Sequence, residues 1–159
     1  MTTEIARFMR RLETLWDEHV AALLERRDVD AAMRDMTAAP SVRHLPTMTG
    51  ADGRSAVDRF YREALLPHLP GELGLTRRSR TVDRFHLVDE LTVSFLHDCE
   101  LAWLLPGIGP TGRRASVAAI VIVDFERGAI ASQRTLWDGA SLATQLGVGI
   151  NGDPVRDRG

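Results

Sequence analysis

The chain has 159 residues, of which 44% are hydrophobic and 26% are charged, and its formal net charge is −2. This length fits one globular domain, and the residue mixture is far from the highly charged, apolar-poor composition of disordered chains. All 20 basic residues are arginines and are scattered among acidic neighbours, so we expect no nucleic-acid partner.

Cys99 is the single cysteine, which excludes a disulfide framework and favours the cytoplasm as the compartment. No apolar run approaches the roughly 20 residues that span a bilayer, and we expect no membrane partner. The sequence also contains no Gly-rich phosphate loop and no metal-binding motif, so neither a cofactor nor a metal ion is expected.

Three helices are predicted in the first half of the chain. Apolar residues within 5–24 recur with the spacing of one helical face over about five turns. Asp28 is suited to cap a second, short helix that ends at Pro40. A third helix is predicted over residues 54–66, with Asp52 as its cap.

Strands follow, apart from a short one predicted at residues 41–45. After Leu75 the apolar residues alternate with a period of two, which indicates β-structure. A tight turn is predicted at residues 89–90, followed by a strand over residues 91–103.

The remaining elements are two strands and a helix. A strand over residues 113–125 is apolar on both faces at its centre, residues 116–123, which predicts burial on both sides. A last strand covers residues 129–137, and a short helix runs from there to Leu146.

Helices followed by an antiparallel meander predict one α+β domain, residues 1–148, with a flexible C-terminal tail, residues 149–159. Three stretches are informative: the aromatic helix 57–61 (VDRFY), the block 94–112 with its SFLHD, WLLPG and PTG segments, and the ending 136–147 with LWDGASL and QLG. Together with the order of the elements, they resemble the nuclear transport factor 2-like superfamily, in its SnoaL-like (polyketide cyclase-like) branch.

The resemblance implies a cone-shaped fold in which three N-terminal helices pack on a curved, mostly antiparallel sheet, with a short C-terminal helix. It also implies an apolar pocket inside the cone and a homodimer. Proteins of this family include polyketide cyclases, ketosteroid isomerase, scytalone dehydratase and limonene epoxide hydrolase, so the fold alone does not define a reaction.

His97 is the first candidate for catalysis. Strand alternation places it on an apolar face with Phe95 and Trp103, where a neutral imidazole could exchange protons near neutral pH. The alternative is a core histidine with satisfied hydrogen bonds, and the sequence is compatible with both.

Two aspartates complete the catalytic set. Asp138 follows Trp137 at the end of the last strand, and the resemblance implies a general base at this Trp-Asp pair; the alternative is that Asp138 only caps the next helix. Asp98 falls on the polar face of its strand, so it reaches the pocket only if a β-bulge shifts the alternation.

Seven ring-bearing side chains are expected to form the pocket wall and to contact the ligand, and two of them could also donate hydrogen bonds. They are Trp16, His44, Phe60, Tyr61, Phe95, Trp103 and Trp137. Aromatic residues at helical and strand spacing are equally typical of side chains that pack in the core. As a wall, these rings would favour a small, flat, apolar molecule.

Two hypotheses of different classes follow. The first is a cofactor-independent enzyme that moves protons on a small apolar carbonyl compound, as in cyclisation, isomerisation or dehydration. The second is a non-catalytic small-molecule-binding or dimerisation module, in which strand 116–123 serves subunit association. An epoxide hydrolase is a further alternative; it needs two acids and a basic residue around one water, and Arg134 is the nearest basic residue on the last strand.

Overall fold

The structure, a computed structural model, describes residues 3–149 of the chain. Six strands form one sheet in the order β2-β1-β6-β5-β4-β3. They are β1 (Met36–Leu45), β2 (Thr49–Asp52), β3 (Leu73–Val82), β4 (His86–Leu96), β5 (Arg114–Glu126) and β6 (Ala129–Trp137). The helices are α1 (Thr3–Val20), α2 (Val29–Arg34), α3 (Arg54–Arg59) and α4 (Gly139–Leu146), with π-helical turns η1 (Ala21–Glu25) and η2 (Phe60–Leu65) and a 3₁₀ turn η3 (Leu66–His68). The predicted α+β class is confirmed, and the predicted tail lies, except for its first residue, outside the described residues.

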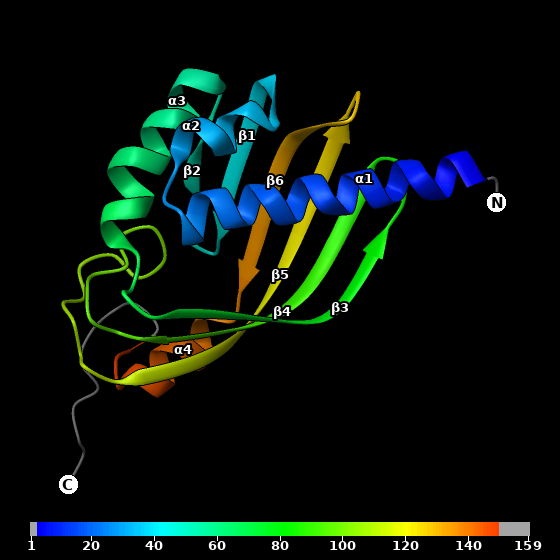
Figure 1. The fold of residues 1–159 in the computed structure, drawn as a ribbon. Helices are drawn as coiled ribbons and strands as arrows, with labels where there is room; N and C mark the ends of the chain where they lie inside the picture. The colour runs from blue at the N-terminus through cyan, green and yellow to red at the C-terminus, as the bar shows by residue number, and fades with distance from the viewer. Residues whose placement is uncertain (1–2, 150–159) are drawn as a thin grey trace, which may run out of the picture.

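The helices and the sheet form two layers. α1 crosses the sheet, and α2 and α3 lie over the end that β1 and β2 form (Figure 1). Neighbouring strands are antiparallel except β1 and β6, which pair in parallel. α4 packs against β5 beyond the end of β6, where the Gln145 side chain accepts from Ser116 N at 2.8 Å and donates to Ser116 O at 2.9 Å.

Side-chain caps fix where two helices begin. The carboxylate of Asp28 accepts from Ala31 N at 3.0 Å, and that of Asp138 accepts from Ser141 N at 3.0 Å, as is typical of aspartate at this position. α4 ends at Gly147, whose φ of 70° is a left-handed conformation that glycine adopts without strain. The predicted cap of the second helix and the capping alternative for Asp138 are therefore confirmed.

The region between the second and third helices differs from the prediction. Pro40 does not end a helix but lies inside β1, at the place where the register with β6 shifts, so its missing N–H costs no ladder hydrogen bond. Asp52 does not cap α3, because its carboxylate accepts from Ser41 Oγ at 2.7 Å and from Arg43 at 2.5 Å across the β1–β2 hairpin. Gly53 occupies the cap position instead.

The turn between β3 and β4 was also predicted at the wrong place. The carboxylate that stabilises this turn belongs to Asp83 and accepts from the backbone N–H groups of Phe85 and His86 at 2.6 and 2.7 Å. Asp89 and Glu90, which the sequence suggested as the turn, lie in the middle of β4. Asp89 belongs to a strand because its carboxylate pairs with Arg80 on the neighbouring strand β3.

The strand predicted over residues 91–103 ends at Leu96, and the loop that follows folds back so that Leu101 and Trp103 are buried outside the sheet, with Leu101 in an isolated bridge to Leu105. The prediction of burial on both faces of β5 is wrong for the single chain. Alternate residues of β5 are buried against the helices, whereas the opposite set, which includes Ile120 and Ile122, is only half-buried or exposed.

The outer face of the sheet therefore carries apolar side chains that the chain itself does not cover. Leu136 of β6 is 41% exposed and lies opposite Ile120 of β5 in the register. Ile122 extends the same patch along β5. This face supports the homodimer expected from the sequence, which remains a prediction.

We expect the wild-type chain to sediment as a dimer in analytical ultracentrifugation and Leu136→Arg to sediment as a monomer, because an unpaired guanidinium in an apolar interface is strongly unfavourable. Met48→Arg is the control, since Met48 is 58% exposed in the β1–β2 turn. A monomeric wild type, or equal effects of the two arginines, would contradict this prediction.

Candidate functional site

A cavity of about 320 Å³ lies between the inward face of the sheet and the helices α1, η1 and η2. Its walls are mostly aliphatic and aromatic. All three tryptophans of the chain, Trp16, Trp103 and Trp137, line it. An enclosure of this size, apolar with a few polar groups, is the usual form of a small-molecule site.

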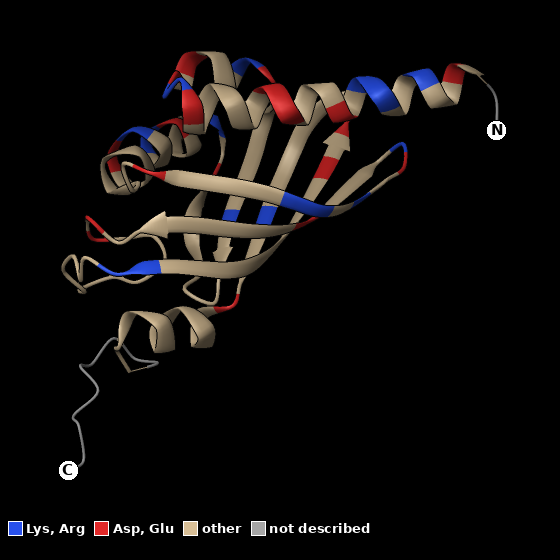
Figure 2. Ribbon diagram, turned by 60° about the horizontal axis from the view of Figure 1, so that its bottom comes forward, with Lys and Arg blue, Asp and Glu red and all other residues tan. Residues whose placement is uncertain are grey.

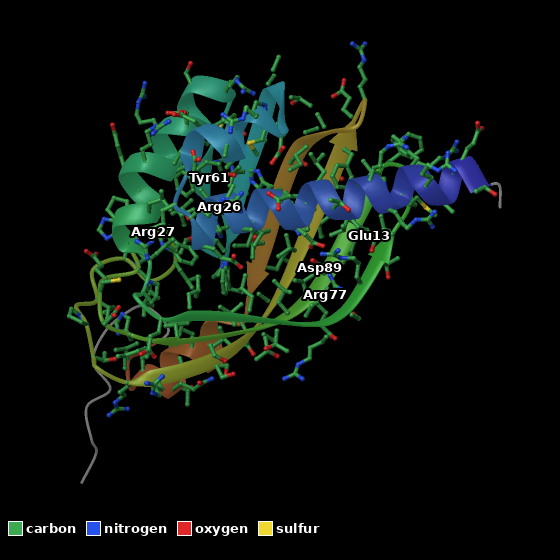
Figure 3. All side chains as sticks on the ribbon, viewed as in Figure 1. Glu13, Arg26, Arg27, Tyr61, Arg77 and Asp89 are labelled. Atoms are coloured by element: carbon green, nitrogen blue, oxygen red, sulfur yellow. The ribbon has the colours of Figure 1, made fainter. Side chains whose placement is uncertain are left out.

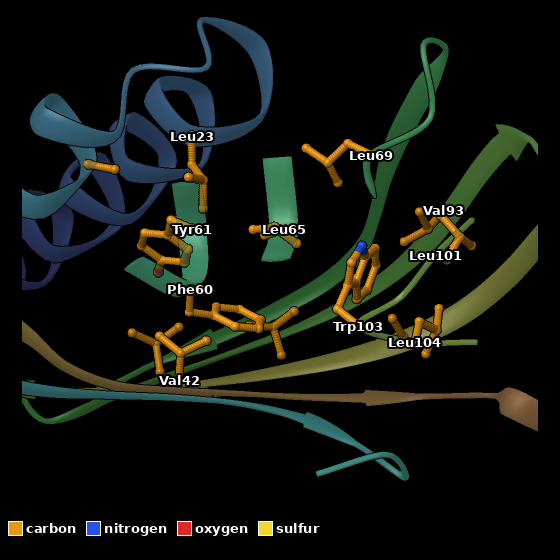
Figure 4. Close-up of a cluster of buried hydrophobic side chains, with 14 of the residues drawn as sticks. Leu23, Val42, Phe60, Tyr61, Leu65, Leu69, Val93, Leu101, Trp103 and Leu104 are labelled. Carbon is orange, nitrogen blue, oxygen red and sulfur yellow. The ribbon is translucent and has the colours of Figure 1, made fainter. Parts of the chain in front are cut away.

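Both helical segments that cover the cavity contain a π-helical turn, an irregularity often found at functional sites. η1 extends α1 and contributes Leu23, and η2 extends α3 and contributes Tyr61 and Leu65. Figure 4 shows Tyr61 and Phe60 above Val42 of β1, with Leu65 and Leu69 on the side toward Trp103.

The register of the sheet sets the floor of the cavity. One row of inward residues crosses five strands, from β1 to β3. It consists of His44, Thr135, Val121, Asp89 and Arg80. The floor thus has a histidine at one end, a charged pair at the other and an apolar middle.

His44 is a neutral hydrogen-bond donor within this floor. It is 5% exposed, and burial lowers its pKa to about 4. Its Nδ1 lies 3.1 Å from Nε1 of Trp137, and because an indole N–H can only donate, Nδ1 is the acceptor and the hydrogen resides on Nε2. No described residue pairs with Nε2, so this N–H is left for a ligand.

His19 and Tyr61 form a second polar pair in the cavity wall. Nδ1 of His19 lies 2.9 Å from Ala32 O and therefore carries the hydrogen of the ring. Nε2 lies 3.3 Å from the Tyr61 hydroxyl and accepts a hydrogen bond from it. Burial lowers the pKa of His19 to about 4, although its hydrogen bond to Ala32 opposes the shift, and burial raises the pKa of Tyr61. Both groups are neutral at neutral pH.

Arg80 closes the far end of the floor. It binds Asp89 through two hydrogen bonds of 2.7 and 2.8 Å and Asp17 of α1 through two of 2.7 and 3.2 Å. Hydrogen bonds to Asp89 raise the pKa of Arg80. Figure 2 shows the arginines of β3 as a blue band. Glu13 of α1 lies 3.8 Å from Arg80, and Arg77 lies 3.9 Å from Asp17; Figure 3 labels Glu13, Asp89 and Arg77 in this region. The cluster ties α1 to the sheet.

Five of the seven predicted wall residues line the cavity: Trp16, His44, Tyr61, Trp103 and Trp137. Phe60 lies behind the wall, with its ring centroid 6.0 Å from that of His44. Phe95 is buried near the end of β4 and does not line the cavity.

The three predicted catalytic residues lie outside the cavity. His97 is fully buried, and its Nδ1 accepts from Thr111 N at 3.1 Å, which fastens the loop after β4. Asp138 caps α4, and Asp98 is on the surface, where its carboxylate accepts from Gly71 N at 3.2 Å. Each has a structural role, and the strand alternation that favoured His97 ends one residue before it.

Several polar residues of the cavity were not anticipated. His19 follows Trp16 by three residues on the buried face of α1, which is the signal that could have revealed it. Gln133 and Thr135 alternate with Trp137 on β6, so a wall position for the tryptophan implies the same face for both. Asp89 was interpreted as a turn residue.

No group of three or more His, Cys, Asp or Glu side chains that could hold a metal ion occurs among residues 3–149. Of the helices in the described part of the chain, none combines the length and the apolar character needed to span a bilayer.

The fold has many counterparts among solved structures, although no protein-family model and no curated protein matches the chain. A candidate SnoaL-like polyketide cyclase from Jannaschia sp. CCS1 is 16% identical, with a TM-score of 0.70 over 97% of this chain and 98% of that one. AclR from Streptomyces galilaeus, a candidate hydroxylase, is 19% identical, with a TM-score of 0.66 over 87% and 97%. A protein of unknown function from Burkholderia pseudomallei, described as NTF2-like, is 17% identical, with a TM-score of 0.65 over 86% and 97%. The chain therefore has the nuclear transport factor 2-like fold predicted from its sequence, in the form found in SnoaL-like proteins.

The buried histidines make stability depend on pH. An imidazole of the unfolded chain titrates near pH 6.5, whereas His19 and His44 titrate at about 4 when folded. Between these values the unfolded chain binds more protons, so the free energy of unfolding falls as the pH falls from about 6.5 to about 4, by about 3 kcal/mol per histidine. Urea unfolding at successive pH values measures this loss.

His44→Phe removes one of the two groups and should flatten the pH dependence between pH 6.5 and 5, above the range where most carboxylates titrate. His86→Ala is the control, because His86 is exposed at the β3–β4 turn. An unchanged slope in His44→Phe would contradict the burial of a neutral His44.

His97→Ala should lower the free energy of unfolding by about 2 kcal/mol or more, because it leaves a void and removes the acceptor of Thr111 N–H. The same urea experiment measures it, again against His86→Ala. An unaltered stability would instead place His97 beside open space.

Proposed function

We propose that this protein is a cofactor-independent enzyme that carries out acid–base chemistry on a small, largely apolar carbonyl compound bound in the cavity. One observation carries the proposal: the neutral imidazole of His44 is buried among aromatic rings, with Nε2–H left without a partner. An N–H group fixed in an apolar enclosure is suited to a carbonyl oxygen and to the negative charge that develops on it.

The aromatic surroundings of His44 define the shape of the ligand. Ring centroids of Trp103, Phe60 and Trp137 lie 4.9, 6.0 and 6.3 Å from that of His44. A carbonyl group that accepts from Nε2 would lie against the rings of Trp103 and Trp137, which line the cavity. Flat, ring-bearing ketones fit such a wall.

Tyr61 and His19 supply a route for the proton. When the carbon next to the carbonyl loses its proton, the electron pair of that C–H bond forms an enolate, whose oxygen accepts from His44 Nε2–H. The proton passes to the Tyr61 oxygen while the phenolic proton passes to His19 Nε2, at 3.3 Å in the resting state. His19 keeps its Nδ1 hydrogen on Ala32 O. Return of the proton to a different carbon of the substrate would complete an isomerisation. In a cyclisation the enolate carbon would first form a bond to a second carbonyl carbon of the same molecule, and the proton would pass to the oxygen of that carbonyl.

A non-catalytic binding module is the second candidate, and one observation favours it. The cavity offers no free carboxylate base in its interior: Asp17 and Asp89 are both engaged by Arg80, and the third acidic residue of the lining, Glu25, is exposed on η1.

An epoxide hydrolase would need two acids and a basic residue around one water. In the cavity, Asp17, Asp89 and Arg80 are the residues of these types that lie together. Arg134, the basic residue suggested by the sequence, pairs with Asp124 at 3.1 Å and does not line the cavity.

The experiment follows exchange of the protons next to the carbonyl of α-tetralone, a flat bicyclic ketone, in D₂O by NMR. We expect the wild type to accelerate exchange over buffer and His44→Phe to lose about 100-fold of that acceleration, which is the usual cost of one oxyanion donor. His44→Gln retains an N–H near the position of Nε2 and should recover part of it.

Binding without exchange, seen as a change in the fluorescence of the three cavity tryptophans, would instead support the binding module. Styrene oxide tests the hydrolase: its hydrolysis by the wild type, lost in Asp89→Asn, would replace the proposed reaction.

A further inference from the structure

Gln133 lines the cavity and carries a hydrogen-bond acceptor that has no partner among the described residues. Its Nε2 donates to Thr135 Oγ1 at 3.3 Å, whereas its Oε1 is buried and has no partner among the described residues. Gln133 lies on β6 and lines the cavity. Buried polar atoms are nearly always paired, so an unpaired one in a cavity wall calls for a partner that enters the cavity.

The character of the unpaired atom depends on which way the amide is turned. Thr135 can accept from the amide nitrogen or donate to the amide oxygen. In either orientation one polar atom of Gln133 is left over, and in the observed orientation that atom is the acceptor. A hydroxyl or N–H group of a ligand is the group that would satisfy it.

The sheet register fixes where this acceptor lies relative to His44. In the parallel β1–β6 pair, His44 is level with Thr135 and Val42 is level with Gln133. Diagonal neighbours of this kind lie about 7–8 Å apart at their Cα atoms. The donor at His44 and the acceptor at Gln133 therefore match two groups on different parts of one molecule, not two groups on adjacent atoms.

We propose that Gln133 determines substrate specificity by accepting a hydrogen bond from a hydroxyl or N–H group of the ligand, while His44 donates to the carbonyl oxygen of the same molecule. The substrate class is then a small, rigid, largely apolar carbonyl compound with a hydrogen-bond donor several bonds away from the carbonyl. The inference rests on the binding step of the proposed function.

Three probes with one bicyclic skeleton separate the two contacts: α-tetralone has the carbonyl only, 5,6,7,8-tetrahydro-2-naphthol has the hydroxyl only, and 6-hydroxy-α-tetralone has both. Isothermal titration calorimetry gives their dissociation constants. We expect the wild type to bind 6-hydroxy-α-tetralone at least tenfold more tightly than α-tetralone.

Gln133→Met, which keeps the length of the side chain without its polar atoms, should abolish this preference. His44→Phe should weaken the two ketones and spare the naphthol. Gln145→Met is the matched control, because Gln145 bonds to Ser116 on β5 and does not line the cavity. Its preference should equal that of the wild type.

The outcomes separate this inference from the proposed function. Equal binding of the two ketones by the wild type overturns the role of Gln133 and leaves the carbonyl site intact. If the ketones do not bind but the naphthol does, and Gln133→Met abolishes that binding, the acceptor role stands and the carbonyl site fails. If none of the probes binds, both are overturned. The comparison of probes on the wild type decides the matter even if Gln133→Met does not fold.

Discussion

The parallel pairing of β1 with β6 is the constraint on which the site depends. It joins a strand that begins at Met36 to one that ends at Trp137, so it brings together side chains almost a hundred residues apart. This pairing puts His44 beside Thr135, and Trp137 close enough to donate to His44 Nδ1. Without it, His44 would have no fixed tautomer, and the N–H available to a ligand would not be defined.

The Arg80 cluster complements that constraint from the opposite end of the floor. A buried ion pair is stabilising only when both partners are well bonded, and breaking one is strongly unfavourable. Arg80 and Asp89 meet this condition through two hydrogen bonds, and Asp17 extends the cluster to α1. The helix that carries Trp16 and His19 is therefore held over the sheet at a fixed place, which keeps the cavity open beneath it.

Much of the fold was predictable because it follows from local patterns. The apolar stripe of α1 and the caps at Asp28 and Asp138 are signals of neighbouring residues, and the structure confirms them. The errors at Asp89 and at Pro40 arose where a partner on a neighbouring strand decides the structure. Arg80 makes Asp89 an inward strand residue, and the register shift beside β6 makes room for Pro40.

The site was predictable only as far as its walls. Aromatic residues are large and apolar, and Trp16, Trp103 and Trp137 do line the cavity, even where the predicted strand was wrong. Their contact with a ligand remains a prediction. The polar groups depend on register and on helix orientation, which a single sequence does not provide. His19 was hidden in an apolar stripe, and Gln133 could have been found only through its alternation with Trp137 on β6.

The groups that can bond to a ligand near His44 are uncharged. Burial keeps His19 and His44 neutral, and Tyr61 remains a phenol at neutral pH. Two guanidiniums line the cavity at the far end of the floor: that of Arg80 is neutralised by Asp17 and Asp89, and that of Arg77 lies 3.9 Å from Asp17. Beside His44 an anionic ligand would lose its hydration and meet no charged partner, whereas a neutral carbonyl compound loses little and gains directed hydrogen bonds. The same argument applies along the reaction: a negative charge that appears only on the way to the transition state meets a donor already in place, so the neutral cavity favours the developing enolate over any ligand that is charged from the start.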